Sequence, residues 1–393
     1  MTDVAERLEE LRDRGLYRRL RLIEGPQGPS VTLDGQQVLL LCSNNYLGLA
    51  DRPEVREAAA DATLRWGAGS GASRLISGNM EPHRRLEERL AAFKGYEAAL
   101  LFGSGYLANT GIIPALARRG EVVFSDELNH ASIVDGCRLS RAETFVYRHG
   151  DLEHLAWGLR QAGTRTALIV TDGVFSMDGD VAPLPELLEL ARRHGARLMV
   201  DEAHATGAVG RGGRGSVSAA GLSGEVDVVI GTLGKALGSY GAYACAGPEI
   251  VELLINTARP FIFSTAPPPP AIGAALAALE LLETEPELVD QLQANAALLR
   301  RSLSAAGLET GGATQVVPVQ VGEAEATMAL CELALEKGVF AQGIRPPTVP
   351  DGTCRLRLTA MATHRKEDLV AAAHMIGVAA REVGLVAAEP LAA

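Results

Sequence analysis

The sequence predicts an α/β protein in which helices sandwich a mainly parallel central sheet, with a smaller C-terminal α+β domain. Between about residues 54 and 260, short apolar runs alternate with helical segments, as in βαβ units. Four prolines at 267–270 break this alternation, and the residues after them mix helices with short strand candidates. We therefore expect an N-terminal arm of helix and hairpin at 1–45, a large domain at 46–280 and a small domain at 281–393.

The N-terminal arm is expected to hold one helix and one hairpin. Residues 4–22 are predicted to be helical because apolar residues recur at helical spacing until Gly25-Pro26 ends the pattern. Residues 31–41 predict a hairpin that turns at Asp34-Gly35, since this dipeptide accepts the left-handed backbone of a tight turn.

The large domain is expected to contain short strands that are apolar on both faces, which is typical of a buried parallel sheet. The strand candidates lie at 99–102, 122–124, 144–146, 167–170, 196–200 and 226–230. Among the helices between them, Leu184–His194 is well marked because Gly195 closes it.

The small domain follows the proline run. An alanine- and leucine-rich helical stretch extends to about residue 303. Strand candidates at 315–321 and 355–358 and a final helix at 366–383 complete an α+β pattern.

Composition and charge disfavour several classes of function. The 393 residues carry a formal net charge of −11, whereas nucleic-acid binding requires a basic surface. The five cysteines form no C-x-x-C pair, which indicates a reducing compartment and no metal site. The N-terminus lacks the apolar core of a signal peptide, and no apolar run is long enough to span a membrane. We expect a cytoplasmic protein with no metal, nucleic-acid or membrane partner.

The most informative residues follow two of the strand candidates. Asp201-Glu202-Ala203-His204 comes after 196–200, and Gly231-Thr232-Leu233-Gly234-Lys235 comes after 226–230. Ligands of open α/β sheets bind at the carboxyl ends of the strands. A lysine held there among small residues, with an aspartate nearby, suits Schiff-base chemistry on pyridoxal 5′-phosphate (PLP). The carboxylate would keep the pyridine nitrogen protonated, which makes the ring an electron sink.

Parts of these two segments also resemble motifs of nucleotide-binding proteins and helicases. A P-loop that ends at Gly234-Lys235 would need glycine at position 229 and serine or threonine at 236, but the chain has Val229 and Ala236. Asp201 to His204 also spells the DEAH box of helicases. Without a P-loop and with an acidic balance, a helicase is disfavoured.

Two further segments could contact a flat phosphorylated cofactor. Gly103-Ser104-Gly105-Tyr106 opens a helix, and the N–H groups at a helix start bind phosphate. Asn129-His130 follows 122–124 and places an imidazole that could stack on a ring. Taken alone, the first segment is also an ordinary turn, and a lone histidine is also a common packing or capping residue.

Together these residues resemble the α-oxoamine synthases, which are PLP enzymes of fold type I. The resemblance covers about residues 16–385. It rests on motifs at 43–49 (Ser-Asn-Asn-Tyr-Leu-Gly-Leu), 67–78 (Gly-Ala-Gly-Ser-Gly-Ala-Ser-Arg-Leu-Ile-Ser-Gly), 201–204, 231–235 and 344–350 (Ile-Arg-Pro-Pro-Thr-Val-Pro), with 355–358 (Arg-Leu-Arg-Leu) beside the last.

The resemblance implies a role for each matching residue around the cofactor. Lys235 carries PLP covalently and acts as the base. Asp201 pairs with the pyridine nitrogen, and His204 and Ser176 reach the 3′-oxygen. His130 stacks on one face of the ring and is counted among the catalytic groups.

The resemblance also implies contacts beyond the reacting atoms. Ala203 packs on the second face of the ring. Gly105, Tyr106 and Thr232 hold the phosphate. The family builds its sites at the interface of a homodimer, and Thr265 would reach the phosphate of the partner subunit.

The implied reaction joins an amino acid to an acyl thioester with loss of CO₂. Asn44 and Arg357 match positions that bind the amino-acid carboxylate, and Arg18 lies where the family has an arginine near the acyl end. The C-terminal motifs favour L-alanine and a pimeloyl thioester of coenzyme A (CoA) or acyl carrier protein, as in biotin biosynthesis. Glycine with acetyl-CoA stays open, as does a promiscuous enzyme, because alanine and glycine differ by a methyl group worth about 1–3 kcal/mol. A silent PLP-binding scaffold is disfavoured by the complete set of site residues.

Overall fold

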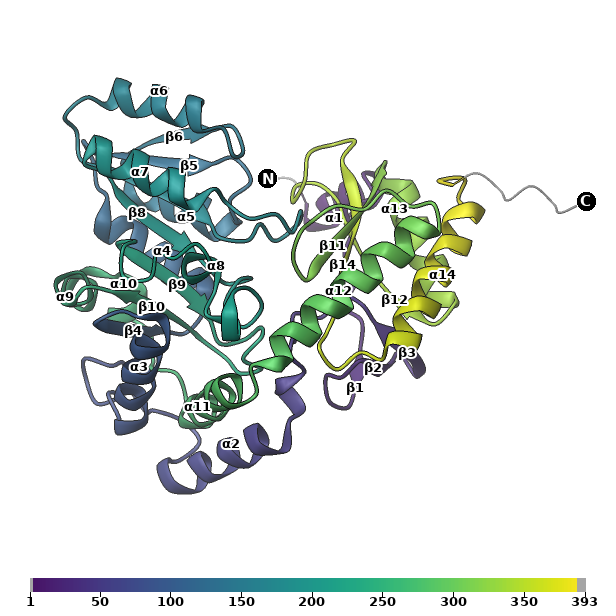
Figure 1. Ribbon diagram of the computed structural model, residues 1–393, viewed down its shortest axis with the longest axis horizontal. Coiled ribbons are helices and arrows are strands. Elements are labelled where there is room, and N and C mark those ends of the chain that lie inside the picture. The colour runs from purple at the N-terminus through teal and green to yellow at the C-terminus, as the bar shows by residue number, and fades with distance from the viewer. Residues whose placement is uncertain (1–2, 387–393) are drawn as a thin grey trace, which may run out of the picture. The chain divides into compact units, whose positions relative to one another are not determined.

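The computed structural model describes residues 3–386, and Figure 1 shows their helices and strands. These residues divide into two compact units. The larger unit holds residues 49–176 and 180–290, and the smaller unit holds 3–48, 177–179 and 291–386. The domain limits expected from the sequence stay a prediction, and their residues 1–2 and 387–393 lie outside the described part.

A seven-stranded sheet forms the centre of the larger unit. In spatial order its strands are β4 (Ala98–Phe102), β10 (Ala242–Ala246), β9 (Val228–Thr232), β8 (Arg197–Asp201), β7 (Ala167–Asp172), β5 (Val122–Asp126) and β6 (Glu143–Tyr147). Every pairing from β9 to β6 is parallel, and β10 is antiparallel to both of its neighbours. The prediction of a mainly parallel α/β sheet is therefore confirmed.

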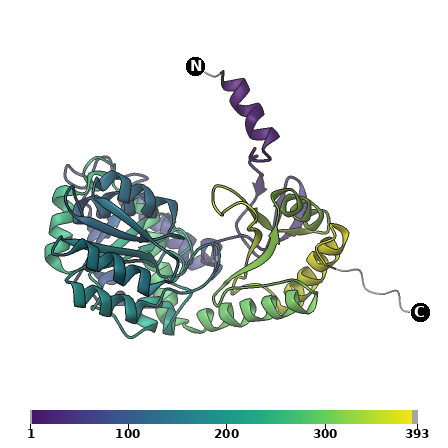
Figure 2. The same cartoon turned by 90° about the horizontal axis from the view of Figure 1, so that it is seen from above.

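Helices cover both faces of this sheet, as Figure 2 shows for the larger unit. They are α2 (Pro53–Trp66), α3 (Glu81–Lys94), α4 (Gly105–Leu116), α5 (Ala131–Ser140), α6 (Leu152–Ala162), α7 (Leu184–His194), α8 (Ser216–Ala219), α9 (Pro248–Thr257), α10 (Arg259–Ile262) and α11 (Pro269–Thr284), with short 3₁₀ turns η1 (Leu49–Asp51) and η2 (Arg211–Gly213). In β9, Val228 packs with Ile112 of α4, whereas its neighbour Val229 packs with Leu187 of α7. Alternate residues of one strand thus enter two different cores, as a sandwiched sheet requires.

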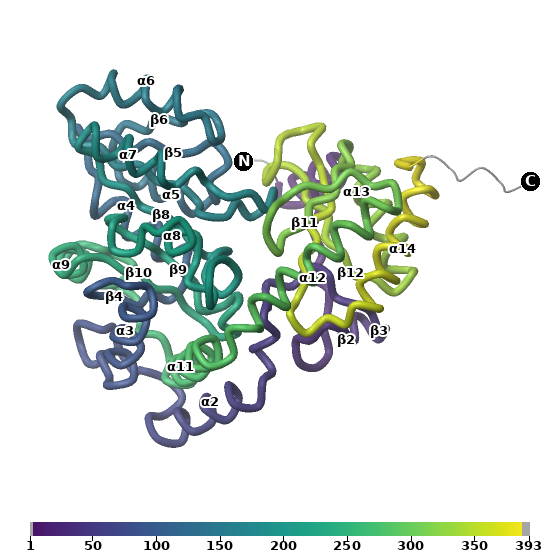
Figure 3. The backbone as a smooth tube through the Cα atoms, viewed as in Figure 1, coloured from purple at the N-terminus to yellow at the C-terminus, as the bar shows by residue number. Residues whose placement is uncertain are grey.

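The smaller unit contains two small sheets. Their strands are β1 (Ile23–Glu24), β2 (Ser30–Leu33), β3 (Gln36–Leu40) and β12 (Val339–Phe340) in one, and β11 (Val316–Gly322), β14 (Cys354–Thr359) and β13 (Gln342–Ile344) in the other. Its helices are α1 (Val4–Asp13), α13 (Ala324–Glu336), α14 (Lys366–Glu382) and, from residue 291 on, α12 (Glu287–Ala305). Figure 3 shows β3, from the N-terminal arm, beside β12, with which it pairs in parallel.

The structure confirms the predicted hairpin and shortens the predicted N-terminal helix. Asp34 and Gly35 link β2 to β3 with positive φ values of 48° and 84°. The expected helix at 4–22 was wrong in length, because α1 ends at Asp13 and Gly15 turns left-handed with φ of 62°. No residue of α1 is buried, so no tertiary packing supports a longer helix.

Other sequence predictions are confirmed with small changes. The helix expected at Leu184–His194 has those limits, and the final helix ends at Glu382. The helical stretch after the prolines is divided into α11 and α12. No helix in the described range 3–386 is long and apolar enough to cross a membrane.

Candidate functional site

The carboxyl ends of the central strands gather the predicted cofactor residues in the larger unit. β8 ends at Asp201, and β9 ends at Thr232, with Lys235 in the following turn. His130 follows β5, and Ser176 follows β7. Because parallel strands finish at the same edge of a sheet, residues far apart in sequence meet there. The structure places these residues at one edge of the sheet, and their contacts with a cofactor stay a prediction.

Asp201 is buried and held by hydrogen bonds to both carboxylate oxygens. Asp201 is only 4% exposed to solvent. Asn109 Nδ2 donates to Asp201 Oδ2 at 2.7 Å, and the backbone N–H of Ala203 donates to Oδ1 at 2.9 Å. Two donors on a buried carboxylate fix its direction.

A second buried carboxyl group lies in the same region. Asp172 ends β7, and its Oδ2 accepts the backbone N–H of His130 at 2.8 Å. Burial, followed by the nearby charge of Asp201, raises the pKa of Asp172 well above its usual value. The raised pKa favours the protonated form of Asp172, because two close carboxylates cannot both ionise at low cost.

His130 begins α5 and is held by that helix. Its Nδ1 lies 2.7 Å from Ser132 Oγ and accepts the backbone N–H of Ser132 at 3.3 Å. Burial lowers the pKa of His130, while Asp201 raises it and Lys235 lowers it. All three groups are thus close enough to influence one another, and burial favours a neutral imidazole.

The start of α4 offers a phosphate-binding geometry. Ser104 caps the helix by accepting the N–H of Leu107, and Gly105 and Tyr106 are the first two helical residues. A Cβ at Gly105 would lie 2.9 Å from Thr232 Cγ2, so glycine lets the helix start approach the end of β9 closely. Exposed amides and the positive end of a helix dipole bind phosphate groups.

Buried Ala203 and His204 follow Asp201, and Thr232 Oγ1 donates a long bond of 3.5 Å to the Ala203 carbonyl. This contact joins the ends of β8 and β9. Ser176 is also buried, in the turn after β7. The structure therefore places Ser176, Ala203 and His204 at one sheet edge, and their contacts with a cofactor ring stay a prediction.

The hairpin that carries Ser176 is held by a charged histidine. His149 Nδ1 lies 3.0 Å from Asp126 Oδ1, and its Nε2 lies 2.8 Å from Asp180 Oδ2. Hydrogen bonds to these two carboxylates raise the pKa of His149 to about 10. Phe175 donates its N–H to the Asp180 carbonyl at 3.0 Å, which closes the hairpin around Ser176.

Thr265 lies on a segment that pairs with the glycine-rich motif at 67–78. Ser73 and Thr265 form an antiparallel bridge, and Ala266 donates its N–H to the Ala72 carbonyl at 3.0 Å. Ser70 Oγ donates to the Pro267 carbonyl at 2.7 Å. The two motifs therefore form one local structure.

In the smaller unit, Asn44 and Arg357 lie within hydrogen-bonding distance of each other. Arg357 Nη2 donates to Asn44 Oδ1 and to Tyr46 Oη, at 3.3 Å each. Arg357 is buried on β14, and Tyr46 Oη donates to Asn44 Oδ1 at 3.0 Å. A positioned guanidinium suits a substrate carboxylate.

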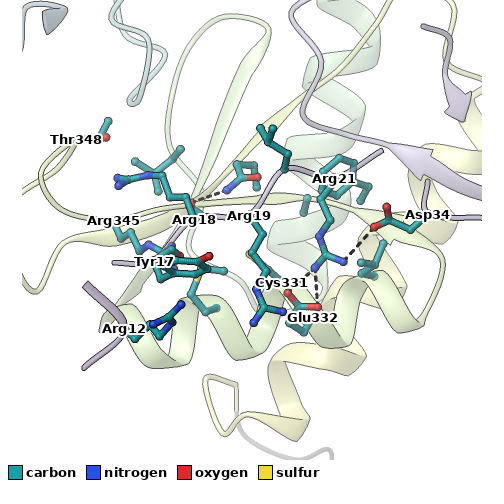
Figure 4. Close-up of a pocket in the computed structure, with 18 residues that line it drawn as sticks. Arg12, Tyr17, Arg18, Arg19, Arg21, Asp34, Cys331, Glu332, Arg345 and Thr348 are labelled. Carbon is teal, nitrogen blue, oxygen red and sulfur yellow. Dashed lines mark hydrogen bonds and ion pairs between the residues drawn. The ribbon is translucent and has the colours of Figure 1, made fainter. Parts of the chain in front are cut away.

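Arg18 lines a different part of the smaller unit, a pocket of about 1010 Å³ shown in Figure 4. Arg345 Nη2 donates to the Tyr17 carbonyl at 2.8 Å, and Arg21 pairs with Glu332 at 2.7 Å. The lining residues include neither Asn44 nor Arg357. The structure thus does not bring Arg18 to the Asn44–Arg357 pair.

Sequence reasoning missed several buried polar residues near this edge. Asn109 and Ser132 contact Asp201 and His130, and Glu202 forms an ion pair with Lys94. One signal was available, because Asn109 is a polar residue within a mostly apolar helix. From the sequence, Glu202 was recognised only as a member of the motif at 201–204, and its buried ion pair was not predicted. No cluster of histidine, cysteine or acidic residues in the described range is suited to hold a metal ion.

Comparisons with known proteins agree with this geometry. Residues 36–376 match the family model "Aminotransferase class I and II". The chain is 57% identical to the 8-amino-7-oxononanoate synthase of Geobacter sulfurreducens over 388 residues, which cover 98% of this chain and 99% of that protein. It is 48% identical to the protein of that name from Symbiobacterium thermophilum over 390 residues, covering 98% and 100%.

Solved structures of PLP enzymes and of a synthase with the same name superpose on most of this chain. Serine palmitoyltransferase from S. paucimobilis, with PLP and myriocin bound, superposes with a TM-score of 0.92 at 33% identity, covering 98% of each chain. An 8-amino-7-oxononanoate synthase from Francisella tularensis superposes with a TM-score of 0.76 at 28% identity, covering 88% of this chain and 98% of that one.

Proposed function

Because the chain belongs to the aminotransferase class I and II family, we propose that its cofactor edge condenses L-alanine with a pimeloyl thioester. The products are 8-amino-7-oxononanoate, CO₂ and a free thiol, which is a step of biotin biosynthesis. The fold is that of the fold-type I PLP enzymes, and the resemblance read from the sequence is confirmed. The chain is a PLP-dependent acyltransferase, because relatives at more than half identity are named 8-amino-7-oxononanoate synthase.

The observation that carries the proposal is the grouping of Lys235, Asp201 and His130 at the ends of β9, β8 and β5. The three groups lie close enough for Asp201 to raise the pKa of His130 and for Lys235 to lower it, while burial lowers it most. The residues fit PLP: a fixed carboxylate suits a pyridinium nitrogen, and the amides of Gly105 and Tyr106 suit a phosphate. When bound, PLP withdraws the electron pair left at the amino-acid Cα.

The residues proposed to hold PLP share this sheet edge. They are Gly105, Tyr106, His130, Ser176, Asp201, Ala203, His204, Thr232 and Lys235, with Thr265 of the partner subunit. Lys235 supplies the amine that attaches the cofactor and, once displaced by substrate, takes the proton from Cα. His204 and Ser176 would donate or accept at the 3′-oxygen, and His130 and Ala203 would pack on the two ring faces.

Asn44 and Arg357 are proposed to bind the carboxylate of alanine, because Arg357 presents a buried guanidinium beside Asn44 Oδ1. Arg18 is proposed to act toward the acyl end, where its pocket carries additional arginines at 12, 19, 21 and 345. Such a basic surface suits an anionic acyl donor, either CoA or acyl carrier protein. We also propose a cytoplasmic homodimer.

Thiol release tests the reaction. Pimeloyl-CoA and acetyl-CoA are each mixed with PLP-loaded protein and with alanine or glycine, and free thiol is measured. Release only with pimeloyl-CoA and alanine supports the proposal. Faster release with acetyl-CoA and glycine would move the protein to the 2-amino-3-ketobutyrate ligases. Release from pimeloyl acyl carrier protein but not from pimeloyl-CoA would identify the carrier protein as the donor.

A further inference from the structure

A chain of side-chain hydrogen bonds connects Asp201 to His130. Asn109 Nδ2 donates to Asp201 Oδ2 at 2.7 Å and to Ser132 Oγ at 2.9 Å. Ser132 Oγ in turn lies 2.7 Å from His130 Nδ1. Asn109 comes from α4, Ser132 from α5 and Asp201 from β8, so three separate elements supply the chain. It joins the group proposed for the pyridine nitrogen to the group proposed for the ring face.

The chemistry of the donors fixes the direction of the two bonds that Asn109 donates in this chain. A carboxylate only accepts, so the amide nitrogen of Asn109 must face Asp201. That NH₂ group has a second proton, which points to Ser132 Oγ. Ser132 Oγ keeps its hydroxyl proton and a second lone pair, so it can donate to His130 Nδ1 or accept from it, depending on the tautomer.

The helix cap decides which role His130 Nδ1 takes. The backbone N–H of Ser132 points to the same nitrogen at 3.3 Å, as part of the cap of α5. A backbone N–H can only donate. A proton on Nδ1 would face this N–H, so Nδ1 accepts here, and the Ser132 hydroxyl is then the donor in its own contact with Nδ1. Burial of the ring also lowers the pKa of His130.

We propose that Asn109 and Ser132 are positioning residues that hold His130 as a neutral imidazole with its proton on Nε2. The same Asn109 amide directs the carboxylate of Asp201. A neutral ring can stack on a pyridinium without adding a second positive charge, so the pyridinium is balanced by Asp201 alone. This consequence rests on the proposed cofactor site, whereas the tautomer itself is a property of the chain without cofactor.

The tautomer is measurable by ¹⁵N NMR of the apoprotein labelled at histidine, at pH 7.5. His130→Gln assigns the signal. We expect an unprotonated Nδ1 and a protonated Nε2. A protonated Nδ1, or a charged ring, would overturn the proposal. The readout needs no substrate and no PLP, so a wrong substrate assignment leaves this test unaffected.

Variants then test the role of Ser132. Ser132→Ala removes the stronger donor to Nδ1 and leaves the weak backbone contact, so we expect a mixture of tautomers. We also expect PLP to bind the apoprotein about threefold to tenfold more weakly, as for loss of one hydrogen bond. Ser132→Thr keeps a hydroxyl and should restore both properties. An unchanged tautomer and an unchanged PLP affinity in Ser132→Ala would contradict the proposal.

The matched control is Ser140→Ala on the same helix. Ser140 is also buried, but its hydroxyl donates to the Cys137 carbonyl at 2.6 Å, outside the chain to Asp201. It should change neither the ¹⁵N signal nor the PLP affinity. A change equal to that of Ser132→Ala would mean that both variants act only by loosening α5, and the positioning role would be refuted.

Discussion

Replacing Lys94 by methionine removes one member of a fully buried ion pair beside the cofactor edge. The side chain of Lys94 is 2% exposed and that of Glu202 is 0% exposed. Glu202 also accepts the Ser216 hydroxyl at 2.8 Å and the Val217 N–H at 2.6 Å. These two bonds remain in the variant, but the negative charge loses its counterion. Leaving one charge of a buried pair unpaired costs about 3–5 kcal/mol.

The expected loss of stability is large enough for thermal unfolding to detect. For a unit of this size, each kcal/mol lowers the midpoint by about 2–4 °C, so Lys94→Met should lower it by roughly 6–20 °C. The double variant Lys94→Met/Glu202→Gln removes the unpaired charge and keeps an acceptor for Ser216. The double variant should recover at least half of the decrease in the unfolding midpoint.

Circular dichroism of the apoprotein gives both midpoints. The control is Arg193→Met, which breaks the exposed ion pair with Glu189 on α7 and should leave the midpoint nearly unchanged. A midpoint for Lys94→Met equal to that of the control, or a double variant no more stable than the single one, would refute the reasoning.

Three further predictions concern the site. Lys235→Ala should abolish thiol release while the circular dichroism spectrum stays native, and normal turnover would exclude Lys235 as the base. Asp201→Asn should slow exchange of the alanine Cα proton by at least tenfold, because the pyridine nitrogen loses its anionic partner. An unchanged exchange rate, followed by NMR in D₂O, would contradict that role. His149 has a raised pKa of about 10, so its stabilisation is complete below its ordinary value of 6.5 and is lost as the pH rises through about 10. Urea unfolding from pH 7 to 10.5 should show this decline in the wild type and a flatter profile in His149→Gln.

The strands and their polar ends were predictable because the sequence pattern is local. A five-residue run with four apolar residues, followed by Asp201 or by the glycine-rich turn that carries Lys235, suffices to indicate a strand that ends at a ligand edge. Helix α1 was overestimated because Leu16 and Leu20 continue the apolar spacing, while only tertiary packing decides whether such a helix persists.

The supporting hydrogen bonds were not predictable for a different reason. Asn109 and Asp201 are 92 residues apart, and nothing in their neighbouring sequence pairs them. The same holds for Lys94 and Glu202, which are 108 residues apart. A buried polar residue can be suspected from an apolar context, as for Asn109, but its partner is defined only when two elements pack.

The pairing of β3 with β12 sets an order for maturation of the chain during synthesis. Leu39 pairs with Val339, which is synthesised roughly 300 residues later, so β3 cannot pair with β12 before then. At about 5–20 residues per second, that wait lasts roughly 15–60 s. The larger unit is fully synthesised once residue 290 has been made, whereas the smaller unit is interrupted by it. For most of translation, β3 of the N-terminal hairpin therefore lacks its partner strand β12. Its apolar residues Val38 and Leu40 are packed against Phe340 only after that residue has been synthesised.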